Sequence, residues 1–166
     1  MASPRTRRLV VVATLVESIL AGMNVDRAVV QMPAWQRTGP LHWAAYSRHA
    51  DLARRAAILY PGSAFANLIL RVAAAISYLG DAHRPPGAAV PLFGAALMAG
   101  CGLLTTIKAA PNMLRVPRLG DDAAALQRAM DGFQFWGNVR GLFQVLAFVG
   151  NVWSLVALLG PAAGRS

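Results

Sequence analysis

Six polar or charged residues stand inside long apolar stretches of this sequence, in positions where they could hold or activate a ligand. They are Glu17, Asn67, Arg71, Arg140, Gln144 and Asn151. A charge at the centre of a hydrocarbon layer costs at least about 2.5 kcal/mol, so such residues usually serve a partner or a ligand. These positions are therefore the first candidates for a functional site.

Helical spacing gathers these polar residues on one face of each stretch, since an α-helix turns by about 100° per residue. The faces consist of Thr14, Glu17 and Asn24 in the first stretch, of Tyr60, Ser63, Asn67, Arg71 and Tyr78 in the second, and of Arg140, Gln144 and Asn151 in the fourth. Three helices with polar faces can direct them into a common interior.

The polar faces allow two interpretations. In the first, Glu17 pairs with Arg71 or Arg140 and the amides only join the helices. In the second, one glutamate cannot neutralise two arginines, and the remaining guanidinium binds an anion such as an enolate, phenolate or carboxylate. The second interpretation makes substrate-binding candidates of Glu17, Asn24, Asn67 and Arg71.

The elements that would position these residues follow from composition. Of the 166 residues 56% are apolar, and only 14% are charged, where about 25% is usual. Four apolar runs, at residues 9–24, 56–79, 87–107 and 133–159, are each long enough to cross about 30 Å of hydrocarbon. We therefore expect an all-α protein, a four-helix integral membrane bundle that forms one domain over residues 1–166.

The first run follows three arginines, and no small-x-small cleavage site comes after it, so we interpret it as an uncleaved span and not as a signal peptide. Residues 25–55 and 108–132 form two large connections on one side of the membrane. Within them we expect an interfacial helix over residues 41–55 and a short helix over 121–130, capped by Asp121 or Asp122. The large connections hold most of the Lys and Arg, which favours the cytoplasm for that side of a bacterial-type cell membrane, although the arginines before the first run favour the opposite orientation.

Several classes of protein and site are disfavoured. The net charge of +9 would suit nucleic acid, but zinc spacings and a recognition helix are absent, so no nucleic-acid partner is expected. One cysteine, Cys101, excludes a disulfide scaffold, and it lies among small residues where it is expected to be inert. Ala95 with Ala99, and Ala96 with Gly100, have the spacing of a close helix contact.

His42 and His49 are seven residues apart and would share one face of a helix. With Asp26 and Glu17 they are the groups able to take a proton near neutral pH, which makes all four candidates for a general base. A metal site is not expected, because a third ligand at a characteristic spacing is missing.

Several short patterns in this chain resemble a known family. They are Ala21-Gly22-Met23 at the end of the first run, Thr105-Thr106 and Pro111-Asn112 around the end of the third, and Trp136, Asn138 and Arg140 at the start of the fourth. Together they are similar to the anthrone oxygenase-like family of membrane proteins. The similarity covers most of the chain in its hydropathy layout and few positions in identity.

The resemblance implies a four-helix membrane protein, and some members of that family oxidise anthrone-type polyketides to anthraquinones without a metal, a flavin or another cofactor. It also implies roles at the matching positions: Asn112, Asn138 and Arg140 as polar donors and Trp136 as a ring-stacking wall. The base is not fixed by the motif, and His42 and His49 are the candidates.

The leading hypothesis is thus a cofactor-independent oxygenase for an apolar aromatic or polyketide-like substrate, with a pocket that faces the large connections. The rival is a non-catalytic bundle that binds lipid or a partner membrane protein, and a small transporter subunit is the third alternative. An enzyme requires a largely apolar cavity lined by Arg140, Asn138 and Asn112. The rival requires no cavity, both Arg71 and Arg140 engaged, and a small-residue face turned to lipid. The sequence leaves the oligomeric state open.

Overall fold

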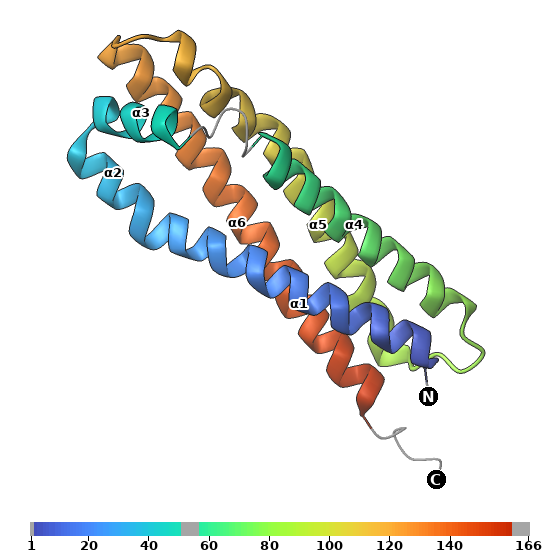
Figure 1. The fold of residues 1–166 in the computed structure, drawn as a ribbon. Helices are drawn as coiled ribbons and strands as arrows, with labels where there is room; N and C mark the ends of the chain where they lie inside the picture. The colour runs from blue at the N-terminus through green and yellow to red at the C-terminus, as the bar shows by residue number, and fades with distance from the viewer. Residues whose placement is uncertain (1, 51–56, 161–166) are drawn as a thin grey trace.

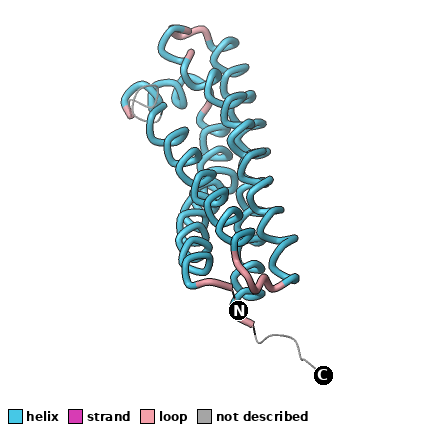
Figure 2. The backbone as a smooth tube through the Cα atoms, turned by 90° about the vertical axis from the view of Figure 1, so that its right-hand side faces the viewer, coloured by secondary structure: helices cyan, strands magenta, loops and turns pink. Residues whose placement is uncertain are grey.

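A computed structural model describes residues 2–50 and 57–160, with the side chains of Ala57 and Tyr60 outside the description. Almost all of this backbone is helical and none of it forms a strand, as Figure 2 shows. The elements are α1 (Pro4–Asp26), the π-helical segment η1 (Arg27–Gln31), α2 (Met32–Thr38), α3 (Pro40–His49), α4 (Ala57–Gly80), α5 (Pro86–Leu114), the 3-10 turn η3 (Val116–Arg118) and α6 (Ala123–Leu159). The all-α prediction is confirmed, and within the described residues four helical segments are long and apolar enough to cross a membrane.

The long helices lie side by side (Figure 1). Helix α1 packs against α4 and α6, and α5 packs against the same two helices. The start of α1, the end of α6 and the α4–α5 connection lie at one end of the molecule, while α2, α3 and the α5–α6 connection lie at the other. We call the first the terminal end and the second the hairpin end.

The first helical segment is longer than the apolar run at residues 9–24. Helix α1 continues through η1 into α2 without a break, from Pro4 to Thr38. Pro33 does not end it and lies just after the π-helical segment, at the second residue of α2. Gly39 does end it, with φ at 92°, a backbone conformation that glycine adopts readily. Most of the expected connection at residues 25–55 is therefore helical.

The expected interfacial helix over residues 41–55 corresponds to α3, Pro40–His49, and residues 51–55 of it lie outside the described part. The expected short helix over 121–130 is the beginning of α6. Asp122 caps it, since its Oδ1 accepts a hydrogen bond of 3.0 Å from the N–H of Ala125. No proline interrupts residues 123–159, so the cap starts a single continuous helix. Helix α5 similarly runs through Pro111 to Leu114.

The small residues of α5 pack against α6. Ala95 and Ala99 are buried, and a Cβ atom on Gly150 would lie 3.1 Å from the Cβ of Ala95. The two backbones thus approach closely at this level, as small residues at a helix contact allow. The lipid-facing position that the rival hypothesis requires for this part of α5 is not observed for Ala95 and Ala99.

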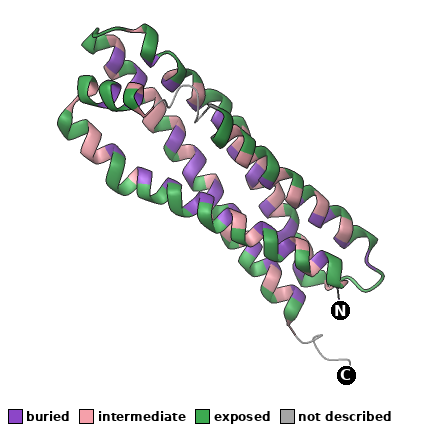
Figure 3. Ribbon diagram, viewed as in Figure 1, coloured by how far each residue is buried: buried purple, intermediate pink, exposed green. Residues whose placement is uncertain are grey.

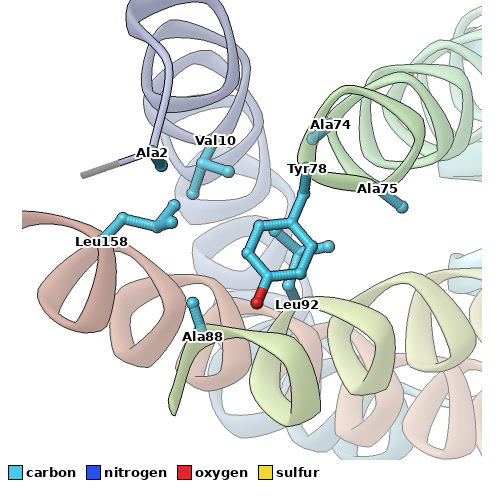
Figure 4. Close-up of a cluster of buried hydrophobic side chains, with 8 residues drawn as sticks. All are labelled: Ala2, Val10, Ala74, Ala75, Tyr78, Ala88, Leu92 and Leu158. Atoms are coloured by element: carbon cyan, nitrogen blue, oxygen red, sulfur yellow. The ribbon is translucent and has the colours of Figure 1, made fainter. Parts of the chain in front are cut away.

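The terminal end is closed by apolar packing. Figure 4 shows the buried cluster formed there by Ala2, Val10, Ala74, Ala75, Tyr78, Ala88, Leu92 and Leu158. The hydroxyl of Tyr78 donates to the carbonyl of Pro85 at 2.7 Å. Asp81, just beyond α4, accepts a hydrogen bond of 3.0 Å from the N–H of Ser3 and so joins α4 to the start of α1.

The Asp81 carboxyl titrates below its usual range. Burial raises its pKa, but hydrogen bonds from Ser3 and Thr6 and the positive charge of Arg84 outweigh burial, so the net pKa is lowered.

Figure 3 shows that exposed residues cover the outer faces of the long helices and that buried residues lie between them. Many of the exposed residues are large and apolar, whereas several polar and charged residues are buried. Leu15 is 60% exposed, Leu97 63% and Leu104 64%, while Glu17 is fully buried. A water-soluble protein shows the opposite distribution.

Candidate functional site

A group of buried polar side chains joins α1, α4 and α6 midway along the molecule. Glu17 and Arg71 form an ion pair in which Oε2 and Nη2 are 2.6 Å apart. Arg71 also donates from Nη1 to Oδ1 of Asn151 at 2.9 Å, and Asn67 donates to Oε2 of Glu17. We call these four residues the central cluster. The interpretation that Glu17 pairs with an arginine is confirmed, and the partner is Arg71.

A second polar layer lies on α1 and α6, two helical turns from the central cluster toward the hairpin end. Asn24 follows Glu17 by seven residues and Gln144 precedes Asn151 by seven, so each pair shares a helix face. The amide of Asn24 donates to Oε1 of Gln144 at 2.5 Å and to the carbonyl of Leu20 at 2.8 Å. Its Oδ1 accepts a hydrogen bond of 3.2 Å from Nε of Arg140.

This second layer borders a cavity of about 240 Å³ at the hairpin end. Four aromatic rings line it, those of Trp35, Trp43, Tyr46 and Phe133. Eight polar side chains line it as well: Asn24, Asp26, Arg27, Gln31, Ser63, Thr106, Arg140 and Gln144. The remaining lining residues have aliphatic or thioether side chains. None of the four residues of the central cluster borders this cavity.

The α2–α3 hairpin is fixed over the cavity by ring contacts and by an ion pair. The rings of Trp35 and Tyr46 are 4.6 Å apart between centroids, and Trp43 lies 6.1 Å from Phe133 of α6. At the end of α3, Arg48 pairs with Asp121 at 3.0 Å and donates to the carbonyl of Gly120. The hairpin therefore supplies three of the four aromatic walls.

Arg27 is a cavity residue that the sequence interpretation assigned to a connection. Its guanidinium is almost fully buried, with its Cζ 5.5 Å from the centroid of the Phe133 ring. A Cβ atom placed on Gly137 would lie 2.4 Å from its Nη1. Arg27 follows Asn24 by three residues and precedes Gln31 by four, so helical spacing carried past residue 24 would have found it.

The π-helical segment that begins at Arg27 contains this part of the lining. Three of the cavity residues, Arg27, Gln31 and the adjacent Asp26, lie in or beside it. Wide turns of this kind often occur at functional sites. Asp26 is exposed, and its Oδ2 accepts a hydrogen bond of 2.5 Å from Nε2 of Gln31.

The two histidines are not cavity residues. His42 and His49 are exposed on α3, and each ring nitrogen Nδ1 meets a carbonyl of its own helix, that of Thr38 at 2.8 Å and that of Ala45 at 2.7 Å. The structure thus brings Asp26, of the four base candidates, to the cavity, with Glu17 held in the central cluster.

The positions that resemble the anthrone oxygenase-like family are also divided between the cavity lining and other parts of the molecule. Arg140 and Thr106 line the cavity, but Asn138, Trp136 and Asn112 do not. Asn138 is exposed, because at 100° per residue it points about 200° away from Arg140. Trp136 packs its ring edge-on against Phe135, with centroids 5.2 Å apart.

Asn112 lies at the contact between α5 and α6. Its amide donates to the carbonyl of Lys108 at 3.2 Å, and its Oδ1 accepts from Nη2 of Arg115 at 2.9 Å. A Cβ atom on Gly132 would lie 2.8 Å from that oxygen, so the amide fills the space beside this glycine.

The chemistry available in the cavity follows from its lining. Two guanidiniums and the amides of Gln31 and Gln144 can donate hydrogen bonds to an oxygen atom, and one carboxylate can accept a proton. Within residues 2–50 and 57–160 there is no group of three or more His, Cys, Asp or Glu that could hold a metal ion. Cys101 is half-buried and lies outside the cavity lining.

Comparisons of this chain with protein-family models, with curated protein sequences and with solved structures found no match. The resemblance to the anthrone oxygenase-like family stays a prediction from the motifs.

Proposed function

We propose that this chain is an integral membrane protein, a transmembrane four-helix bundle that binds an apolar ring compound in its cavity. The distribution of side chains supports the membrane assignment. Aliphatic residues cover the outer faces of the four long helices, and charged residues such as Glu17 and Arg71 are paired inside. Lipid accommodates this arrangement, because it solvates aliphatic side chains and penalises charges.

The lining of the cavity supports the class of ligand. Its volume of about 240 Å³ lies below the range of about 300 to 1,000 Å³ typical of drug-sized ligands, so a compact molecule fits best. Four aromatic rings favour flat, apolar compounds, and Arg140 with Gln144 on one wall favours an oxygen acceptor on the ring. We infer a fused-ring ketone or phenol as the ligand.

The proposed reaction is oxidation of such a ketone by dioxygen without a cofactor. Asp26 removes a proton from the methylene group that lies across the central ring from the carbonyl, and guanidinium groups hold the oxygen of the enolate that forms. The enolate then transfers electrons to dioxygen. Overall, the methylene carbon loses two hydrogens and becomes a carbonyl with one oxygen atom of dioxygen, and the other oxygen atom leaves as water.

The single observation that carries this proposal is that a carboxylate and two guanidiniums border the same ring-lined cavity. Asp26 is our candidate base in place of His42 and His49, because it borders the cavity and they do not. The motif resemblance supports the same chemistry, with Arg140 as the matching position. The proposed partner is thus a small molecule, and lipid binding without catalysis is the competing outcome.

The test uses the purified full chain in lipid nanodiscs, with anthrone and dioxygen. We expect oxygen uptake and anthraquinone formation above that of empty nanodiscs, and none without oxygen. Asp26→Asn should lower the rate about 100-fold or more, the usual contribution of a general base. His42→Ala and Asn138→Ala are the matched controls and should leave the rate unchanged.

Two results would contradict the proposal. A rate in Asp26→Asn and Arg140→Ala equal to that of the wild type would remove the cavity as the site. Tight binding of phospholipid in the cavity, with no oxygen uptake above empty nanodiscs, would establish the non-catalytic alternative.

A further inference from the structure

We propose that Gly137 is a positioning residue of the cavity, which acts by leaving space for the guanidinium of Arg27. The proposal rests on the proposed binding of an oxygen-bearing ring compound. It adds a determinant of specificity at a position that does not border the cavity and that carries no functional group.

The geometry around Gly137 is too close for a side chain. A Cβ atom there would lie 2.4 Å from Nη1 of Arg27 and 2.6 Å from both Cζ and Nη2. Four residues earlier on the same face of α6, the ring of Phe133 lies 5.5 Å from the same Cζ. The guanidinium is thus held between the ring of Phe133 and the bare backbone at Gly137, beside the cavity that both Arg27 and Phe133 border.

Gly137 and Gly141 also have the spacing of a small-x-x-x-small helix contact, so packing of α1 is the competing explanation. The two glycines differ in what lies against them. At Gly141 a Cβ atom would meet the Cβ of Asn24 at 3.4 Å, an ordinary contact. At Gly137 it would meet the far end of a flexible side chain, which can move while the helix stays in place. Substitution of Gly137 by alanine should therefore displace the guanidinium without separating α1 from α6.

Displacement of Arg27 has a specific consequence for ligand choice. A ring compound with a carbonyl oxygen gains a charge-assisted hydrogen bond from a guanidinium at this wall, while the same ring without oxygen gains only apolar contact. Gly137 therefore controls the preference for the oxygenated ring, and it leaves the affinity for the bare ring unaltered.

The experiment compares the binding of anthraquinone and anthracene to the full chain in lipid nanodiscs, without a catalytic step. Quenching of tryptophan fluorescence reports binding, because Trp35 and Trp43 border the cavity. We expect the wild type to bind anthraquinone about a hundredfold more tightly than anthracene, the ratio that one net hydrogen bond from each of the two guanidiniums, those of Arg27 and Arg140, gives. In Gly137→Ala that ratio should fall about tenfold, because the hydrogen bond from Arg27 is lost while that from Arg140 is kept, with the affinity for anthracene within about twofold of wild type.

The control variants separate positioning from packing. Gly22→Ala changes a glycine of α1 with no heavy atom within 4 Å of an added Cβ, and Gly141→Ala changes the other glycine of the pair. Both should keep the wild-type ratio. Arg27→Ala should lower the ratio of the two affinities as much as Gly137→Ala does. The double variant should lower it no further than either single variant, because both changes remove the same contact.

An unchanged ratio in Gly137→Ala would overturn the inference, and so would an equal loss of affinity for both compounds, which would indicate a packing defect. A wild type that binds neither compound would refute the proposed function, and the inference with it. A wild type that binds both compounds without preference would refute the inference alone.

Discussion

The central cluster and the second polar layer both contain polar residues of α1 and α6, yet they differ in what lies opposite those residues. In the central cluster, α4 places Arg71 against Glu17 of α1, and Asn67 and Asn151 complete the group. Two turns nearer the hairpin end, Asn24 and Arg140 meet each other beside a cavity lined with rings. An arginine in a helix bundle therefore joins helices where a neighbouring helix offers a carboxylate, and it can face a ligand where the helices enclose a cavity.

The largest expected effect comes from breaking the central cluster. Arg71→Leu leaves the carboxylate of Glu17 buried without its cation, and removal of one partner of a buried pair costs about 3 to 5 kcal/mol. We expect that loss in the free energy of unfolding, measured by titration of detergent-solubilised protein with dodecyl sulfate and followed by circular dichroism.

The double variant Glu17→Leu/Arg71→Leu is the control for this prediction. It removes both charges and should recover most of the lost stability, because aliphatic side chains replace the pair. Wild-type stability in Arg71→Leu alone would show that the cluster does not hold the helices together.

The matching change in the second polar layer should affect binding more than stability. Arg140→Ala removes a donor at the ring-lined wall, which should weaken binding of anthraquinone by about 1.5 to 3 kcal/mol, the value of a hydrogen bond to a charged group. Its unfolding free energy should fall by less than that of Arg71→Leu. Fluorescence quenching and dodecyl sulfate titration on the same preparation measure both quantities. Equal effects of the two arginine variants on stability and on binding would erase the distinction between the two regions.

A smaller effect is expected where the hairpin is attached. Arg48 and Asp121 form an ion pair at 3.0 Å whose side chains are 32% and 82% exposed. Exposed pairs contribute about 0 to 1 kcal/mol, so Arg48→Ala should change the unfolding free energy by no more than that. Protection of α3 amides from hydrogen exchange is the more sensitive measurement, and it should fall in this variant while protection in α4 stays constant.

The smallest effect concerns acid pH and a residue outside both regions. The pKa of Asp81 is lower in the folded protein than its ordinary value of about 3.9. Its stabilising contribution is thus complete above that ordinary pKa and is lost as the pH falls through the folded pKa. Asp81→Asn should therefore flatten the loss of thermal stability below about pH 4, measured by circular dichroism. An identical pH profile in the variant and the wild type would assign the acid sensitivity elsewhere.

The apolar runs and the polar faces could be predicted from the sequence, because both are local properties of a helix. The spacing of Glu17, Asn67 and Arg71 predicts three helix faces, and the ion pair between Glu17 and Arg71 was one of two interpretations left open. Which arginine pairs with Glu17 depends on the depth and rotation of α4 and α6 relative to α1. Those quantities depend on contacts between helices, such as that of Ala95 with Gly150. The sequence of one helix alone does not determine such contacts.

The cavity residues were harder to predict. Hydropathy ends the first run near residue 24, where polar residues begin, although the helix continues to Thr38. Hydropathy therefore assigns Arg27 to a connection and does not identify it as a cavity residue. His42, His49 and Asn138 were chosen for their chemistry, but helix rotation turns them outward. Asn138 could have been rejected from the sequence, since Arg140 lies two positions further along the helix, which places the two on opposite faces.

The wide turn at Arg27–Gln31 separates two walls of the cavity that belong to one continuous helix. A π-helical turn closes its hydrogen bonds one residue further along the chain than an α-helical turn does. The polar residues before this turn are thus aligned with α6, whereas Met32 and Trp35 after it take a different rotational setting. Deletion of a single residue within the turn would rotate the aromatic wall by about 100° while the donors stayed where they are.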